Sequence, residues 1–233
     1  KNCLCCFKMK TAIIVITYNN HQLFLPQIHR IKKHCKDDYE ILIFDNSTNH
    51  ETIRFIEHHC DKLGIKRIKT NASSSNGSAS HCFSAQLSYT MMKDQYDLFL
   101  YLDHDAFPIK DFSVKEVLGD KLIAGIGQQK SKTYLWPGCL MFKRMDEVDF
   151  GTNHEFGLDT GGNLYKIIEQ HPNEVIYFDE IHTQNPEFTK TMYNFYALIN
   201  QGMFLHFVNG SGWNNVGHHQ ERINSLLNIL AKS

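Results

Sequence analysis

Apolar residues collect in short, unbroken runs along the first half of the chain. Three runs stand out, at residues 11–17, 40–44 and 98–102, and a weaker one covers residues 65–68. Continuous runs of this length, rich in β-branched and aromatic residues, are typical of strands buried on both faces. We therefore expect four buried strands in this half.

Helical spacing of apolar residues fills the gaps between these strands. A first helix is predicted to run to Lys33, and Pro26 lies near its start, where proline is tolerated. Thr48 and Glu51 have the spacing of a capping box and predict the start of a second helix. A third helix follows the small, polar segment 70–80. The apolar positions that mark the helices are Leu23, Phe24, Ile28 and Ile31, then Ile53, Ile56 and Leu63, then Phe83, Leu87 and Met91.

The second half of the chain is less regular. Strands are predicted at residues 122–127, 175–178 and 204–208, and a turn into a further strand at 136–142. A helix with an apolar face follows Asn163, and an amphipathic helix closes the chain, marked by Ile223, Leu226, Leu227 and Leu230.

The alternation of strands and helices predicts an α/β fold, with a mostly parallel sheet flanked by helices. We see no internal repeat or linker and expect a single domain over residues 1–233. In such sheets, ligands bind beyond the carboxyl ends of the strands. The three strong strands end there in polar residues: Thr17, Tyr18 and Asn19; Asp45, Asn46 and Ser47; Asp103, His104 and Asp105. The sequence therefore predicts a polar binding site at this edge.

Asp103 and Asp105 are two residues apart in extended backbone, so their side chains would point the same way. Two carboxylates this close repel each other unless a cation lies between them. Oxygen ligands at the end of a strand suit Mg²⁺ or Mn²⁺, which keep open positions for phosphate oxygens. The alternative is a pair of solvated aspartates in a surface turn.

Composition and charge narrow the class of protein. The 24 basic and 25 acidic residues nearly balance, which argues against a general nucleic-acid or membrane-surface binder. The seven cysteines form no pair of CxxC motifs, so neither a zinc site nor a disulfide framework is predicted. No apolar run approaches the ~20 residues of a transmembrane helix, and no signal peptide is visible. We expect a cytoplasmic protein, soluble or peripherally attached to a membrane, and leave its oligomeric state open.

The order of these motifs resembles that of the GT-A glycosyltransferases, particularly the family 2-like members. Thr17-Tyr18-Asn19 is similar to the family's T-x-Y-N start, Asp45-Asn46-Ser47 to its D-N-S element, Asn76-Gly77-Ser78-Ala79 to its N-x-G stretch, and Asp103-His104-Asp105 to its DxD motif. The resemblance implies a Rossmann-like GT-A fold. It also implies a nucleotide-sugar-binding half at about 11–108 and an acceptor-binding half at about 109–233.

The resemblance implies a nucleoside site at the ends of the first two strands. Thr17, Tyr18, Asn19 and Asp45 would receive the nucleoside, with Asp45 hydrogen-bonding the base or the ribose. Two alternatives remain open. Tyr18 can instead pack on the core, and Asp45 can instead cap the helix that follows it.

The resemblance also implies a diphosphate and metal site. Asn76 and Gly77 would let the backbone approach the ribose and the diphosphate, unless this segment is a flexible surface loop. Asp105, with Asp103 beside it, would hold Mn²⁺ or Mg²⁺ against the diphosphate. His206 would complete the metal site, although a lone histidine in an apolar strand can also be a core residue. The other candidates for this ligand are His182 and His218.

The acceptor side needs a carboxylate that takes the proton of the attacking hydroxyl. Asp159 is our candidate for this base, and Glu155 is the second choice. The family often has an acidic pair here, whereas this sequence has one acid, and Asp159 or Thr160 can instead cap the following helix. Trp136 and Trp213 can stack on sugar faces or pack in the core.

These observations predict a metal-dependent glycosyltransferase of the hexosyltransferase type. It would transfer a sugar from a nucleotide sugar to a glycan or other hydroxyl acceptor. We expect the donor to be a UDP-sugar and the anomeric configuration of the sugar to be inverted. One alternative is a haloacid dehalogenase-type phosphatase with Asp103 as nucleophile and Asp105 as acid. Phe107 and the three strands before the motif disfavour it. The other alternative is a non-catalytic domain that binds nucleotide sugars or glycans.

Overall fold

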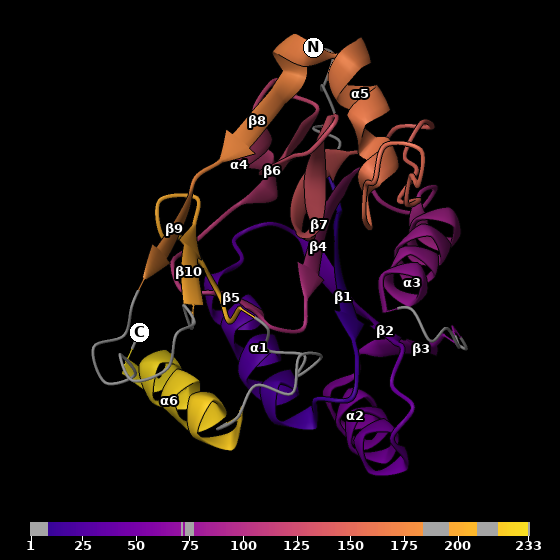
Figure 1. Cartoon of the computed structure of the whole chain (residues 1–233). Coiled ribbons are helices and arrows are strands. Elements are labelled where there is room, and N and C mark those ends of the chain that lie inside the picture. Colours follow the sequence, from indigo (N-terminus) through magenta and orange to yellow (C-terminus); the bar gives the residue numbers. More distant parts are fainter. Residues whose placement is uncertain (1–8, 71, 73–76, 184–195, 209–218, 233) are drawn as a thin grey trace, which may run out of the picture.

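A seven-stranded sheet forms the centre of the molecule, with helices packed on both of its faces (Figure 1). The computed structural model describes residues 9–70, 72, 77–183, 196–208 and 219–232. Across the sheet, the strands are β3 (Lys66–Lys69), β2 (Tyr39–Asp45), β1 (Thr11–Thr17), β4 (Leu98–Asp103), β7 (Thr133–Lys143), β6 (Ile123–Gln129) and β8 (Val175–Phe178). Neighbouring strands are parallel except where β7 pairs with β4 and β6. The prediction of a mostly parallel α/β sheet is confirmed.

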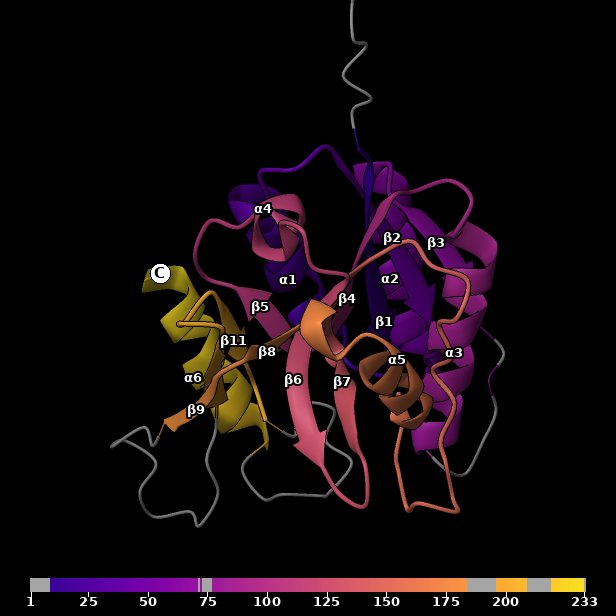
Figure 2. The ribbon, with the colours of Figure 1, turned by 90° about the horizontal axis from the view of Figure 1, so that it is seen from above.

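The helices form two layers, one on each face of this sheet (Figure 2). The first layer consists of α1 (His21–His34), α2 (His50–Leu63) and α4 (Val114–Leu118). The second consists of α3 (Gly77–Met92) and α5 (Tyr165–Gln170), with 3-10 turns at Gly162–Leu164 and Pro172–Glu174. Every residue of β1 is buried, because alternate side chains enter the two layers, and this explains its continuous apolar sequence.

A second, antiparallel sheet lies beside the end of β4. Its strands, in order, are β5 (Ala106–Pro108), β11 (Phe204–His206), β10 (Tyr196–Ile199) and β9 (Glu180–Thr183). The last helix, α6 (His219–Lys232), packs on this sheet and on α1. The sequence pattern predicts only β11, because strands of three or four residues are too short to show a reliable alternation. No helix in the described ranges is long and apolar enough to cross a membrane.

The apolar residues that mark α3 in the sequence are not the ones that it buries. Phe83 is 54 % exposed and Met91 43 % exposed. The buried side is made of Ser80, Ser84, Ala85, Ser88, Tyr89 and Met92. Its small residues let the helix approach the sheet closely, and their hydroxyls find partners inside: Ser88 shares a 2.8 Å hydrogen bond with the hydroxyl of Tyr101.

Two local predictions need correction. The cap of α2 is Asn49 rather than Thr48, since the Asn49 side chain accepts a 3.0 Å hydrogen bond from the Thr52 amide. The predicted turn at the start of 136–142 lies inside β7. There the pairing with β6 shifts register, so the residues between Leu135 and Leu140 bulge out of the ladder.

Candidate active site

A cavity of about 400 Å³ lies at the carboxyl ends of β1, β2 and β4. The first turns of α3, parts of β6 and β7, and the segment before α5 complete its walls. Its lining residues are Ile16, Tyr18, Asn46, Gly77, Ser78, His81, Asp103, His104, Asp105, Gln128, Trp136, Asp159 and Thr160. Among these described residues three are aspartates and none is lysine or arginine, so the cavity suits a cation, or a ligand that brings one.

Asp103 is paired with a histidine that sequence reasoning missed. Nε2 of His81, on α3, lies 2.7 Å from Oδ1 of Asp103. Burial is the largest single influence and by itself would raise the pKa of Asp103, but the contact with His81, together with the charges of His104 and His206, holds that pKa below its usual value. Burial would likewise lower the pKa of His81, yet Asp103, with Asp105 and Asp159 further away, raises it. The only sequence signal for His81 is its position one helical turn after Gly77.

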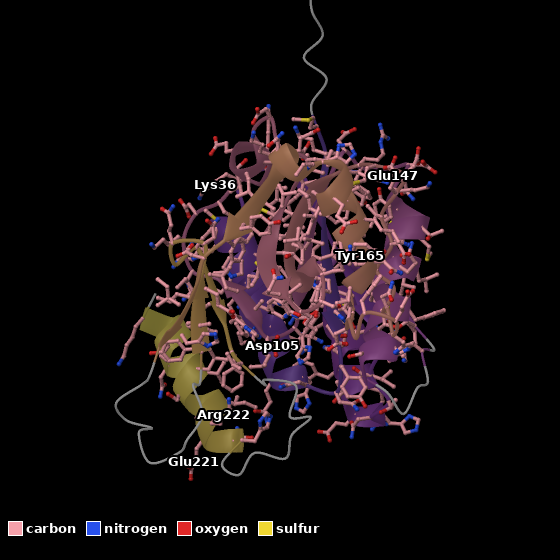
Figure 3. All side chains as sticks on the ribbon, turned by 45° about the horizontal axis from the view of Figure 1, so that its top comes forward. Lys36, Asp105, Glu147, Tyr165, Glu221 and Arg222 are labelled. Carbon is pink, nitrogen blue, oxygen red and sulfur yellow. The ribbon has the colours of Figure 1, made fainter. Side chains whose placement is uncertain are left out.

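Asp105 has a different environment from Asp103. Its side chain is nearly buried, and its Oδ1 has no hydrogen-bond partner among the described residues. Nε2 of His206 lies 3.9 Å from this oxygen. The second sheet brings the two together, because His206 pairs with Ala106 and the Phe207 amide donates a 2.8 Å hydrogen bond to the Asp105 carbonyl. Figure 3 shows Asp105 among the side chains at the centre of its view.

Asp105 and His206 fit a divalent cation with open coordination positions. Two ligands bound at about 2.1 Å to one ion lie roughly 3–4 Å apart, and the separation of 3.9 Å falls in this range. A carboxylate oxygen and an imidazole nitrogen suit Mn²⁺, whereas Mg²⁺ favours oxygen. In the described part of the chain no three His, Cys, Asp or Glu side chains gather to hold an ion by themselves. Of the predicted ligands, Asp103 lies nearby but is paired with His81.

Asp45 has a structural environment and does not line the cavity. Its side chain is fully buried. Oδ2 accepts hydrogen bonds of 3.1 and 2.7 Å from Arg67, and Oδ1 accepts others from the Ser47 amide and the Thr17 hydroxyl. Both carboxylate oxygens of Asp45 are thus used inside the fold, which disfavours its predicted contact with a nucleoside. Asn46 lines the cavity in its place.

The residues at the end of β1 have different environments: one lines the cavity, one is buried, and one holds the loop before α2. Tyr18 lines the cavity, as predicted for a ligand-facing residue, whereas Thr17 is buried beside Asp45. Asn19 has a left-handed backbone, with φ of 45°, and its Oδ1 accepts hydrogen bonds from the Thr48 and Asn49 amides. Asn19 thus holds the loop before α2 rather than lining the cavity.

The Gly-containing segment reaches the cavity at the first turn of α3. Gly77 is the first residue of this helix, and both Gly77 and Ser78 line the cavity. The amides at the start of a helix have no partner within it, so this end of α3 suits an anion. Asn76 lies outside the described residues.

Asp159 lies at the mouth of the cavity. Its side chain is exposed, and its Oδ1 accepts a 2.8 Å hydrogen bond from the Thr160 amide. Thr160 in turn donates a 3.0 Å hydrogen bond to the Ser78 carbonyl, which ties this segment to the start of α3. Glu155, the second choice for a base, is exposed and does not line the cavity.

Trp136 lines the cavity from the bulge of β7. Its ring is tilted by 38° against the His206 ring, with 4.6 Å between ring centroids, and it lies so close to Gly138 that a Cβ there would clash with it. His182, a candidate ligand, is exposed on β9 and lies 3.5 Å from Glu180 rather than in the cavity lining. Trp213 and His218 lie outside the described residues.

Comparison with known proteins supports the fold. No protein-family model and no curated protein sequence matches this chain. Among solved structures, it is similar to the mannosyltransferase PcManGT from Pyrobaculum calidifontis in complex with GDP-Man and Mn²⁺, at 12 % identity and a TM-score of 0.51. The match covers 74 % of this chain and 55 % of the mannosyltransferase, so this chain spans about half of that protein's length.

Two further structures match less well. TarS from S. aureus has 17 % identity and a TM-score of 0.44, over 63 % of this chain and 31 % of TarS. The bifunctional glycosyltransferase WbbM, in its apo structure, has 14 % identity and a TM-score of 0.45, over 74 % of this chain and 39 % of WbbM. The likeness to the mannosyltransferase, together with the strand order, shows that this chain has a GT-A-like glycosyltransferase fold.

Proposed function

We propose that this protein is a metal-dependent glycosyltransferase that moves a sugar from a nucleotide sugar to a glycan or other hydroxyl acceptor. The observation that carries the proposal is the pairing of Asp105, which lines a cavity at the carboxyl edge of a GT-A-like fold, with His206, which lies behind it at 3.9 Å. A UDP-sugar is the first donor to test, and inversion at the anomeric carbon is the expected outcome.

Asp105 and His206 are the residues that would hold Mn²⁺, and the start of α3 lines the same cavity as Asp105. When bound, the cation neutralises the charge that develops on the departing nucleoside diphosphate. Gly77, the first residue of α3, can offer its amide to the same phosphates. Asp103, oriented by His81, remains available to the ribose hydroxyls.

Asp159 is the group that would activate the acceptor. Its carboxylate lines the cavity mouth and is solvent-accessible, as a base for an incoming hydroxyl must be. It would take the hydroxyl proton while the acceptor oxygen forms a bond to the anomeric carbon and the bond from that carbon to the phosphate oxygen breaks. Trp136 offers an apolar ring face against which a sugar can stack.

The first test is calorimetry with UDP, GDP and TDP, each with and without Mn²⁺. We expect one nucleotide to bind, more tightly with Mn²⁺, and Asp105→Asn to lose the effect of the metal. Asp120→Asn is the matched control, because the Asp120 side chain is 88 % exposed and does not line the cavity. Binding to none of the three nucleotides, or an unchanged metal effect in Asp105→Asn, would contradict the proposal.

A second test asks whether the site is catalytic. Slow, Mn²⁺-dependent hydrolysis of the donor without acceptor would exclude a purely binding domain. Rapid phosphate release from a generic aryl phosphate would instead revive the phosphatase alternative. The anomeric configuration of the transfer product, read by NMR, decides between inversion and retention.

A further inference from the structure

The imidazole of His206 lies between two carboxylates. Nε2 faces Asp105 at 3.9 Å, and Nδ1 faces Oε1 of Glu180 at 3.8 Å. Within the described part of the chain, Nδ1 of His206 is buried without a hydrogen-bond partner. We propose that Glu180 is a positioning residue, which holds the His206 ring with Nε2 directed at Asp105 and at the cation. This inference rests on the proposed function.

Strand register places Glu180 on the same face of the second sheet as His206. His206 pairs with Ala197 on β10, and Ala197 pairs with His182 on β9. Glu180 is two residues from His182, so its side chain emerges on the same face. On β10, Ala197 lies opposite both His206 and His182, whereas Ile199 lies opposite Glu180. The contact between Glu180 and His206 therefore runs diagonally across β10, past the small side chain of Ala197.

Burial and charge agree with this arrangement. The side chain of His206 is 14 % exposed and that of Glu180 27 % exposed, so their interaction is partly shielded from water. Among the described residues, Nε2 of His182 lies 3.5 Å from Oε2 of Glu180, which leaves Oε1 directed toward His206. A movement of about 1 Å would bring Oε1 within hydrogen-bonding distance of Nδ1.

A carboxylate on Nδ1 has a defined effect on an imidazole ligand. It fixes the tautomer with the proton on Nδ1, which leaves the lone pair of Nε2 for the cation, and it limits rotation of the ring. Trp136 packs against the same imidazole in a tilted arrangement and restricts it from a second direction. Glu180 thus acts on the cation through His206 and touches neither substrate nor cation.

The test compares Mn²⁺ affinity in four variants, measured by the EPR signal of free Mn²⁺ with and without UDP. We expect Glu180→Ala to weaken Mn²⁺ binding by about 10- to 100-fold. Glu180→Gln should weaken Mn²⁺ binding less, because its amide oxygen can still accept a hydrogen bond from the protonated Nδ1 of His206. His182→Gln, which alters the other neighbour of Glu180, should bind Mn²⁺ like the wild type, and Asp105→Ala should lose the site.

Two controls separate positioning from folding. Metal-free UDP binding and the thermal unfolding midpoint should match the wild type in Glu180→Gln, which keeps the size of the side chain. Ala197→Val, which places two methyl groups between Glu180 and His206, should weaken Mn²⁺ binding in the same direction as Glu180→Ala.

The outcomes are distinct. Wild-type Mn²⁺ affinity in Glu180→Ala, with the site lost in Asp105→Ala, would overturn the role of Glu180 and leave the metal site standing. Equal weakening in Glu180→Ala and His182→Gln would also overturn it, because the effect would then not be specific to the contact with His206. Wild-type Mn²⁺ affinity in Asp105→Ala would overturn the metal site and with it both proposals.

Discussion

Nε2 of His81 lies 2.7 Å from Oδ1 of Asp103, and this contact makes the two aspartates of the DxD motif chemically different. One carboxylate is balanced by a neighbouring imidazolium inside the protein. The other, Asp105, keeps an oxygen without a protein hydrogen bond in the described structure. Of the two carboxylates of the motif, that of Asp105 therefore keeps an oxygen for an incoming cation.

The pair predicts a pH-dependent contribution to stability. Because the pKa of His81 is raised in the folded protein, protonated His81 stabilises the fold fully at a pH below 6.5, its ordinary pKa. This stabilisation is lost as the pH rises through the raised pKa. Because the pKa of Asp103 is lowered in the folded protein, ionised Asp103 stabilises the fold fully at a pH above 3.8, its ordinary pKa. This stabilisation is lost as the pH falls through the lowered pKa.

We therefore expect His81→Gln to destabilise the metal-free protein most between about pH 4 and 6.5, by about 1–3 kcal/mol. Urea unfolding across the pH range measures this difference. His154→Gln, at an exposed position, is the control and should leave the pH profile unchanged. A difference between wild type and His81→Gln that stays constant from about pH 5 to 9 would contradict the paired state.

Asp45→Asn should act on folding and not on the donor. Removing the charge of Asp45 leaves the largely buried guanidinium of Arg67 with only the exposed carboxylate of Glu57, and we expect a loss of about 3 kcal/mol in the free energy of unfolding. The folded fraction should bind UDP with unchanged affinity in calorimetry. A stable Asp45→Asn variant with weakened UDP binding would instead restore the direct contact with the nucleoside.

Asp159→Asn should lower kcat by about 10²–10⁴ while leaving the affinities for UDP and Mn²⁺ unchanged, since it would remove only the acceptor base. Steady-state kinetics and calorimetry measure the two effects separately. Glu155→Gln, on the same segment but outside the cavity lining, is the matched control. Equal losses in both variants would indicate a disturbed loop rather than a lost base.

Substitutions on the exposed face of α3 should change the free energy of unfolding little, and substitutions on its buried face should lower it. Phe83→Ser removes a mostly exposed ring and should change the free energy of unfolding by no more than about 0.5 kcal/mol. Ser88→Leu adds volume where the helix meets the sheet and should cost about 1–3 kcal/mol. Urea unfolding of both variants checks the assignment, and the reverse order of effects would show that the helix buries its apolar stripe.

The strands of the main sheet could be predicted because full burial on two faces leaves a direct mark on the sequence, as in residues 11–17. The face of α3 could not, because serine carries no apolar signal even where it is buried, as at Ser84 and Ser88. Likewise, the polar ends of the strands predicted where the cavity lies. They could not distinguish Asp45, which is used internally, from Asn46, which lines the cavity.

The roles of the site aspartates that the sequence did not predict depend on partners from other parts of the chain. Arg67 decides the role of Asp45 and His81 that of Asp103, and neither partner belongs to a strand-end motif. The prediction of His206 near Asp105 came from resemblance alone. His206 lies near Asp105 because β11 pairs with β5, and strands this short leave no recognisable pattern in the sequence.

The second sheet has a consequence for how the protein is made. Asp105 is translated well before His206, and the two meet only after β11 has paired with β5. A nascent chain that has released only the first half from the ribosome can build β1, β2, β3 and β4, but it lacks one of the two candidate cation ligands. Completion of the metal site would thus coincide with the arrival of the C-terminal part of the chain, and a shortened chain ending before Phe204 would carry the DxD motif without its histidine.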